Sequence, residues 1–525
     1  MDAARRGGRR TPPVASAALA AAALGAALAG GPTAGFGATN DLDETATAVR
    51  ASQATFPEFL EFLRLPSDSI VASDIERAAD FIERAFARRG FETRQLANDG
   101  KPLVYAHYPS ATAGARTVLF YMHFDGQPVV ASEWSQPDPW VPVVKQRTAN
   151  GQWQPVDARR LQDDPLDPEL RVFGRCAADD KAPIMMFLAA FDALRTAGSG
   201  PAFDVKVLLD SEEERGSPSM GKIVLANRAL LRTDGIVIHD GPRHPSNRPT
   251  LVFGNRGVAS VTLTVFGPRV PLHSGHYGNY VPNPAMRLAQ LLASMKDERG
   301  RVLVRGYYDK VHLSDEDRRV LADSGDDEAA IRQRVGIASA EAVGSNYQEA
   351  LQYPSLNVRG MAAASVGDKA ANIVPHRAVA ELDLRTTPET PPDYLFGLLQ
   401  DHVRRQGFHL VTGEPSDADR ERYDKLAALT LSGGSAAERT PLSSPLGTWA
   451  YGALRAAGAG VMPVRIRMMG GSVPTDSLVD ALGAPFVIAP LVNADNNQHT
   501  FDENLRVGHY VEGVHTLLVL LRSPY

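Results

Sequence analysis

The hydrophobic pattern of the first half of the chain predicts helices, then buried strands that alternate with helices. Between residues 44 and 95, apolar side chains recur at helical spacing, as at Phe56, Phe59 and Phe62. A helix-like stretch at 182–197 lies among four apolar runs of strand length, which are 103–107, 117–121, 205–209 and 235–239. This alternation predicts an α/β fold with a mixed, mostly parallel sheet flanked by helices.

From about residue 258 the pattern becomes that of a second, smaller domain. Residues 258–266 and 379–384 alternate as half-buried strands do, and residues 409–412 are the expected closing strand. Amphipathic helices are predicted at 284–296 and 393–405, with an excursion rich in Asp, Glu and Arg after the first of them. We therefore expect an α+β domain at 258–432, inserted into a first domain that occupies 45–257 and 433–525.

The remaining segments complete the first domain. Near Pro441 the chain is expected to return to it, with a helix at 446–457, a strand at 484–490 and a terminal helix from Val507. Residues 134–170 are polar and rich in Pro, Asp and Gln, which predicts a long surface loop.

The N-terminal residues predict export. Four arginines between Arg5 and Arg10 precede an apolar run at 14–29, which ends in Ala27-Leu28-Ala29. This pattern is typical of a secretory signal at 1–29, so the mature protein is expected in the periplasm or outside the cell. An uncleaved anchor is the alternative, but the run is short and mostly alanine for a membrane span. No stable membrane association is expected after cleavage.

Composition narrows the function classes. The chain has 525 residues and a formal net charge of -6, with no basic stripe, so nucleic acid is not an expected partner. Its single cysteine, Cys176, rules out an internal disulfide and leaves a catalytic thiol as one alternative.

Candidate metal ligands occur in five short segments, most of which follow predicted strands. Each segment alone has a plainer explanation, since Asp179 could cap a helix and Glu213 and Glu214 could belong to a solvated acidic loop. The candidates, in chain order, are His123 with Asp125, then Asp179, Glu213 with Glu214, Asp240, and His499. Nitrogen and oxygen ligands without thiolate favour a catalytic site for two divalent cations, zinc above all, with cobalt or manganese as alternatives.

The order of these motifs resembles the zinc-dependent exopeptidase and aminoacylase family, most of all its carnosinase-like dipeptidase branch. That family also includes glutamate carboxypeptidase, acetylornithine deacetylase and succinyl-diaminopimelate desuccinylase. The resemblance implies that Asp179 bridges two ions, that Glu213 is the general base, and that Asp125 orients one ligand. It implies five ligands, which are His123, Asp179, Glu214, Asp240 and His499.

The same resemblance assigns the inserted domain to a lid that also forms a homodimer. It implies that His273, in Leu272-His273-Ser274-Gly275, reaches the active site of the other subunit. Candidate substrate-binding residues are, by the same likeness, Asn372, Arg385, Gly471 and Ser472. Arg385 would suit a terminal carboxylate because a guanidinium can form two parallel hydrogen bonds with it.

Departures from the family pattern affect the expected substrate. Cys176 and Ala182 stand where the family usually has glycine, and Met468 and Met469 stand where arginine and glutamate are common. The methionines count against recognition of a charged amine. We expect hydrolysis of amide bonds in dipeptides or small peptides, with an N-acyl amino acid deacylase as the alternative and a non-enzymatic binding protein as a more distant one.

Overall fold

The computed structural model describes residues 41–458, 460–471 and 476–525, and residues from Asn40 onward form one compact unit. The expected signal at 1–29 and Ser472 lie outside the described residues. Among the helices that are described, none is long and apolar enough to cross a membrane.

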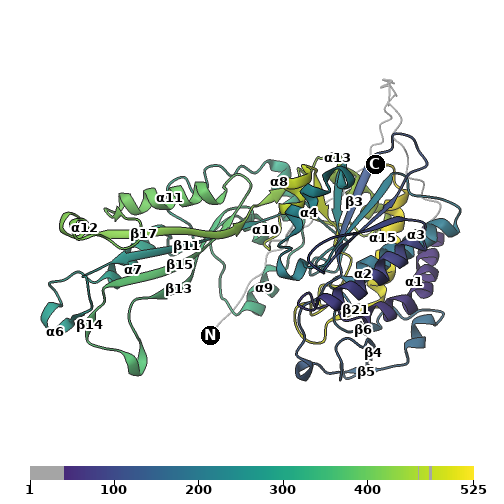
Figure 1. Ribbon diagram of the computed structural model, residues 1–525, viewed down its shortest axis with the longest axis horizontal. Coiled ribbons are helices and arrows are strands. Elements are labelled where there is room, and N and C mark those ends of the chain that lie inside the picture. The colour runs from purple at the N-terminus through teal and green to yellow at the C-terminus, as the bar shows by residue number, and fades with distance from the viewer. Residues whose placement is uncertain (1–40, 459, 472–475) are drawn as a thin grey trace, which may run out of the picture. The chain divides into compact units, whose positions relative to one another are not determined.

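The centre of the fold is an eight-stranded sheet that confirms the predicted α/β class (Figure 1). Strand β3 pairs in parallel with β7 and β8, β8 with β20, and β9 with β19, whereas β1, β2 and the β20–β9 contact are antiparallel. In spatial order the strands are β1 (Glu92–Leu96), β2 (Leu103–Tyr108), β7 (Asp204–Asp210), β3 (Thr117–His123), β8 (Gly235–Ile238), β20 (Phe486–Ile488), β9 (Thr250–Val252) and β19 (Val464–Ile466).

Helices cover both faces of this sheet, which explains its nearly unbroken apolar strands. Along β3, Phe120 belongs to one core and Leu119 and Tyr121 to the other, because successive side chains point to opposite faces. The first core includes α1 (Asp41–Leu63), α2 (Ala72–Ala87), α3 (Lys181–Thr196), α13 (Pro445–Ala457) and α15 (Val507–Arg522). The second includes α4 (Met220–Ala226), α5 (Arg228–Leu231) and α14 (Asp476–Leu482).

The inserted α+β unit is a five-stranded sheet with two helices packed on one core. Strand β11 alternates buried and half-buried residues along its length, as the sequence predicts for a sheet covered on one face. The strand order is β13 (Ser355–Ala362), β15 (Arg377–Thr386), β11 (Gly257–Phe266), β17 (Leu426–Ser435) and β16 (His409–Leu410), and the helices are α7 (Pro284–Met295) and α11 (Pro392–Arg405).

Short elements connect the two sheets and extend the second. The expected boundary at residue 432 falls inside β17, and β10 (Gly254–Asn255) pairs with β18 (Glu438–Arg439) where the chain enters and leaves the insertion. Strand β12 (Leu272–His273) pairs with β14 (Ile373–Val374), followed by α6 (Ser274–Tyr277). Helix α12 (Asp417–Arg422) precedes β17.

Two local predictions are wrong. The helical region predicted to residue 95 ends at Ala87, and β1 follows it. Residues 134–170 are not one long loop, because β4 (Val143–Arg147) and β5 (Trp153–Pro155) join β6 (Arg171–Phe173) and β21 (Asn504–Arg506) in a four-stranded sheet. The partner strand β21 lies more than 300 residues away in the sequence, so local composition did not reveal it.

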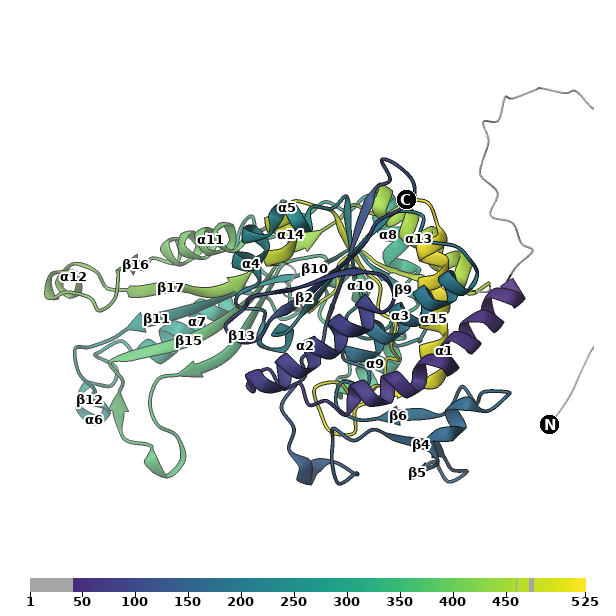
Figure 2. The same cartoon turned by 45° about the vertical axis from the view of Figure 1, so that its right-hand side comes forward.

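The acidic excursion after α7 also folds. It contains α8 (Asp315–Ala322), α9 (Glu328–Val335) and α10 (Tyr347–Ala350). Helix α8 packs on β19 of the eight-stranded sheet. A segment that belongs to the insertion by sequence is therefore in contact with the first domain (Figure 2).

Candidate metal centre

The carboxyl ends of three neighbouring parallel strands position the site. His123 is the last residue of β3, Asp210 ends β7, and Asp240 follows β8 by two residues. Such an edge is where open α/β sheets place their ligands. Asp179 precedes α3, Glu213 and Glu214 lie in a short turn after β7, and His499 comes from a loop close to the C-terminus.

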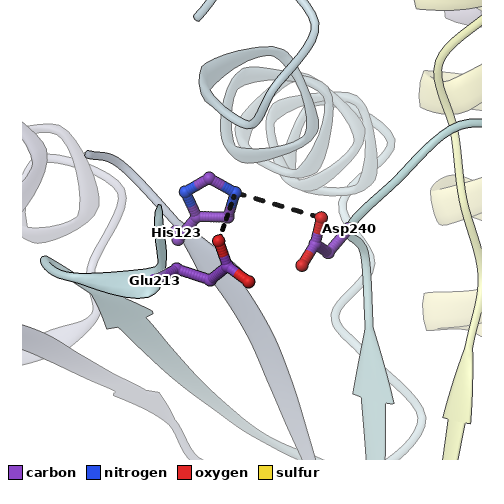
Figure 3. Close-up of side chains that lie close together, drawn as sticks. All are labelled: His123, Glu213 and Asp240. Atoms are coloured by element: carbon purple, nitrogen blue, oxygen red, sulfur yellow. Dashed lines mark ion pairs between the residues drawn. The ribbon is translucent and has the colours of Figure 1, made fainter. Parts of the chain in front are cut away.

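Two groups of side chains could each hold a metal ion. In the first, His123, Glu213 and Asp240 offer ligand atoms that all lie within 4.8 Å of one another. Its His123 Nε2 atom lies 3.9 Å from both Glu213 Oε2 and Asp240 Oδ1 (Figure 3). In the second group, His499 Nε2 lies 3.1 Å from Glu214 Oε2 and 3.1 Å from Asp179 Oδ2.

Asp179 connects the two groups. Its Oδ1 atom lies 3.0 Å from His123 Nε2, while its Oδ2 atom faces His499. One carboxylate thus presents an oxygen to each histidine, which is the arrangement that a bridging ligand between two cations needs.

The gathered carboxylates are electrostatically unfavourable without positive charge among them. Burial raises the pKa of Glu213 well above its ordinary value, and the Asp240 carboxylate raises it further. Burial also raises the pKa of Asp240 to about 6. Hydrogen bonds with Asp179 and Glu214 raise the pKa of His499 to about 10, so the site already favours a cation at that point. Four carboxylates and two imidazole nitrogens fit two divalent cations.

Asp125 fixes both a ligand histidine and the turn that carries the glutamates. Its Oδ1 atom lies 3.3 Å from His123 Nδ1, on the ring edge away from the ligand groups. Its two carboxylate oxygens also accept the backbone N–H groups of Glu213 and Glu214, at 3.0 and 3.2 Å. A buried carboxylate in this place orients the imidazole for metal binding.

The three successive glutamates have different surroundings. Glu212 forms an ion pair with Lys101 and accepts a 2.9 Å hydrogen bond from Asn98, outside both ligand groups. Glu214 accepts a hydrogen bond of 2.8 Å from Gln127. Only the second and third glutamates therefore face the candidate centre.

Sequence reasoning missed Glu503, which holds the loop before Asp179. This carboxylate is fully buried and accepts backbone N–H groups of Cys176, Ala178 and Asp179 at 3.0, 2.9 and 2.9 Å. It also pairs with Arg175 at 2.9 Å. Its position four residues after His499 was the one available signal.

Cys176 is buried and unsuited to nucleophilic catalysis. Burial raises the pKa of its thiol to about 12, far from the thiolate that a nucleophile requires. Its backbone φ is +63°, in the left-handed region that favours glycine, which gives a physical reason for the glycine expected there.

A cavity of about 450 Å³ opens beside the ligands. Asp179, Glu213, Asp240 and His499 line it. Met469 lines it as well, whereas Met468 is fully buried elsewhere. The loop after Asp240 also lines it, together with apolar residues of the eight-stranded sheet and residues in or next to α9 and α10. Among these are Val252, Ile331, Tyr347, Leu351, Ile466 and Ile488.

Among the described residues that were expected to contact substrate, His273, Asn372 and Arg385 do not line this cavity in the subunit. Gly471 directly follows the lining residue Gly470. His273 and Asn372 lie together, since the Asn372 carbonyl accepts the Ser274 N–H at 2.9 Å. Figure 1 places α6, which His273 caps, at the end of the five-stranded sheet away from β3. Arg385 lies on β15, and its Nε atom is 3.8 Å from Asp383 Oδ2.

Known proteins are similar to this chain in sequence. Residues 253–409 match the M20 peptidase dimerisation domain. The Cys-Gly metallodipeptidase dug1 of Schizosaccharomyces pombe is 25% identical over 467 residues, covering 85% of this chain and 90% of that protein. The Beta-Ala-His dipeptidase of Mus musculus is 23% identical over 407 residues, covering 76% and 75%.

Solved structures agree in fold. The M20 family metallo-carboxypeptidase Sso-CP2 from Sulfolobus solfataricus superposes with a TM-score of 0.66 and 26% identity, covering 89% of this chain and 98% of that one. The di-peptidase Dug1p from Saccharomyces cerevisiae gives a TM-score of 0.62 at 20% identity, covering 91% and 98%. The chain carries the M20 peptidase dimerisation domain and is a metal-dependent peptidase.

Proposed function

We propose that the chain is an exported dipeptidase that works as a homodimer with two zinc ions in each subunit. The observation that carries this proposal is the pair of ligand groups joined by Asp179, with Glu213 beside them at the edge of the cavity. The metallodipeptidases among the similar proteins support the substrate class.

Within these two groups we assign the metal-binding roles as follows. His123, Asp179 and Asp240 would hold one ion, and Asp179, Glu214 and His499 the other. Bound there, two divalent cations supply Lewis-acid activation of the scissile carbonyl and of the attacking water. Zinc suits imidazole and carboxylate ligands best, and cobalt and manganese are the alternatives.

Glu213 is the proposed proton carrier. Its raised pKa lets the carboxylate accept a proton from the attacking water and return it to the leaving amine. Asp125 keeps the His123 ring oriented throughout. In the dimer, the partner subunit's His273 would donate to the developing oxyanion, and Asn372, Arg385, Gly471 and Ser472 would contact substrate.

A deacylase is the second candidate. Met469 and the apolar residues beside it give the cavity a surface that would accept an acyl chain or an apolar side chain. Met468 and Met469 stand where arginine and glutamate are common in the family, so these positions offer no carboxylate to hold a free amine.

The substrate class can be decided with a matched pair of compounds. We expect the zinc-loaded protein to release amine from an Ala-X dipeptide and not from the N-acetyl-X counterpart, and a chelator to abolish the reaction. Release is measured with an amine-reactive dye. Cleavage of the acetyl compound alone would identify a deacylase, and cleavage of neither would contradict the proposed function.

Neighbouring glutamates provide a test of the mechanism. Glu213→Gln should keep both metals and lower kcat by roughly 10²- to 10⁴-fold, because only proton transfer is removed. Glu214→Gln should instead lose metal, since it removes a ligand. Metal content is measured on the purified variants beside turnover. Near-normal turnover in Glu213→Gln would overturn its role as the base.

Mixing two inactive variants tests the cross-subunit role of His273. His273→Ala should lower kcat with unchanged metal content, whereas His276→Ala, a neighbour in α6, should not. After subunit exchange with Glu213→Gln, about half of the dimers are mixed and each has one complete site, so about a quarter of the wild-type activity should return. If no activity returns although mixed dimers form, His273 does not act across the interface.

Export rests on the arginine-rich start and the apolar run at 14–29. We expect the mature protein, recovered from outside the cytoplasm, to begin just after Ala29. Mass spectrometry of the intact chain measures this directly. Retention of the full chain in the membrane fraction would favour the anchor instead.

A further inference from the structure

Helix α9 is fixed to the loop that carries a metal ligand. Asp326, just before α9, faces His244, with 3.2 Å between Oδ1 and Nε2. Its other oxygen accepts hydrogen bonds from Ser324 and Gln348, at 2.8 and 2.9 Å. Because His244 follows Asp240 by four residues, this buried cluster sets the position of α9 relative to the candidate metal centre.

A second cluster anchors the same segment. Arg467, which is 7% exposed, donates to Asp317 Oδ1 at 2.8 Å and to Gln352 Oε1 at 3.0 Å. Gln352 in turn donates to the carbonyl of Met468 at 3.2 Å. Separating a buried charge from its partner is costly, so the segment from α8 to α10 forms a fixed wall of the cavity.

Arg334 is the cation on this wall that lacks an acidic partner among the described residues. It is exposed on α9 and lines the cavity together with Asp179, Glu213 and Asp240. The other lining cations are engaged, since Arg243 pairs with Glu512 and His244 with Asp326. Two divalent ions would offset the four carboxylates of the centre, which leaves the Arg334 charge available to a ligand.

We propose that Arg334 is a specificity-determining residue that binds a carboxylate of the substrate, an inference that rests on the proposed function. A guanidinium recognises a carboxylate through charge-assisted, often paired hydrogen bonds. The carboxylate is the C-terminal one or that of an acidic side chain, because either presents the same group. The apolar residues that line the same cavity would contact the uncharged part of the substrate.

Binding to an inactive protein tests this independently of turnover. Calorimetry with metal-loaded Glu213→Gln compares three probes: alanyl-alanine, alanyl-alaninamide and the α-amide of alanyl-glutamate. Arg334→Ala in that background should weaken binding of the carboxylate probe by about 10- to 100-fold and leave alanyl-alaninamide unchanged. Arg334→Lys should restore part of the loss, since it keeps the charge.

Arg332 supplies the matched control. It lies on the same helix but pairs with Glu328 at 3.6 Å and lines a neighbouring cavity, so Arg332→Ala should bind all probes normally. If Arg334→Ala loses affinity only for alanyl-alanine, Arg334 binds the C-terminal carboxylate. If it loses affinity only for the glutamate α-amide, Arg334 binds the side-chain carboxylate. The proposal would be overturned if Arg334→Ala lost affinity equally for alanyl-alaninamide, if it lost affinity for no probe, or if no probe bound at all. Failure of the proposed function is recognised separately, as absence of turnover by the wild-type enzyme.

Discussion

Mutual repulsion among the carboxylates of Asp179, Glu213, Glu214 and Asp240 is the constraint on which the rest of the site depends. Unit charges at 4 Å interact by about 4 kcal/mol near a protein surface, so four of them are held together only by positive charge and rigid support. Protonated His123 and His499 supply that charge without metal, and the proposed cations supply it when they are bound. The strand ends, the Asp125 bonds to the glutamate turn and the Glu503 bonds to the Asp179 loop supply the support.

The elements that carry these ligands could be predicted because their signal is local. Strands at 117–121, 205–209 and 235–239 are buried on both faces, so their apolar runs are nearly unbroken and their ends are easy to recognise. Ligand candidates at those ends then follow from chemistry. In the turn after β7, the sequence alone does not show which of the three glutamates face the site. The structure separates Glu212, which pairs with Lys101, from its two neighbours.

What could not be predicted depends on residues far apart in the sequence. The sheet formed by β4, β5 and β6 is completed by β21, and Glu503 reaches the Asp179 loop from the same distant region. Gly470 lines the cavity, but Arg385 on β15 and Asn372 directly before β14 do not, and no local pattern indicates which of them meets substrate. His273 is a further case, because its proposed role needs a second subunit.

One segment of the inserted domain is attached to the first domain by its buried contacts. The segment from α8 to α10 lies between β11 and β13 of the five-stranded sheet along the chain, yet its buried polar contacts are with His244 and Arg467 of the first domain. Breaking such a contact leaves a buried charge unpaired, at a cost of about 3–5 kcal/mol. A rearrangement of the five-stranded sheet that preserves these contacts must therefore leave α9 in place beside the metal ligands. It would have to be accommodated by the short β10–β18 pair and by the two links that join this segment to α7 and to β13.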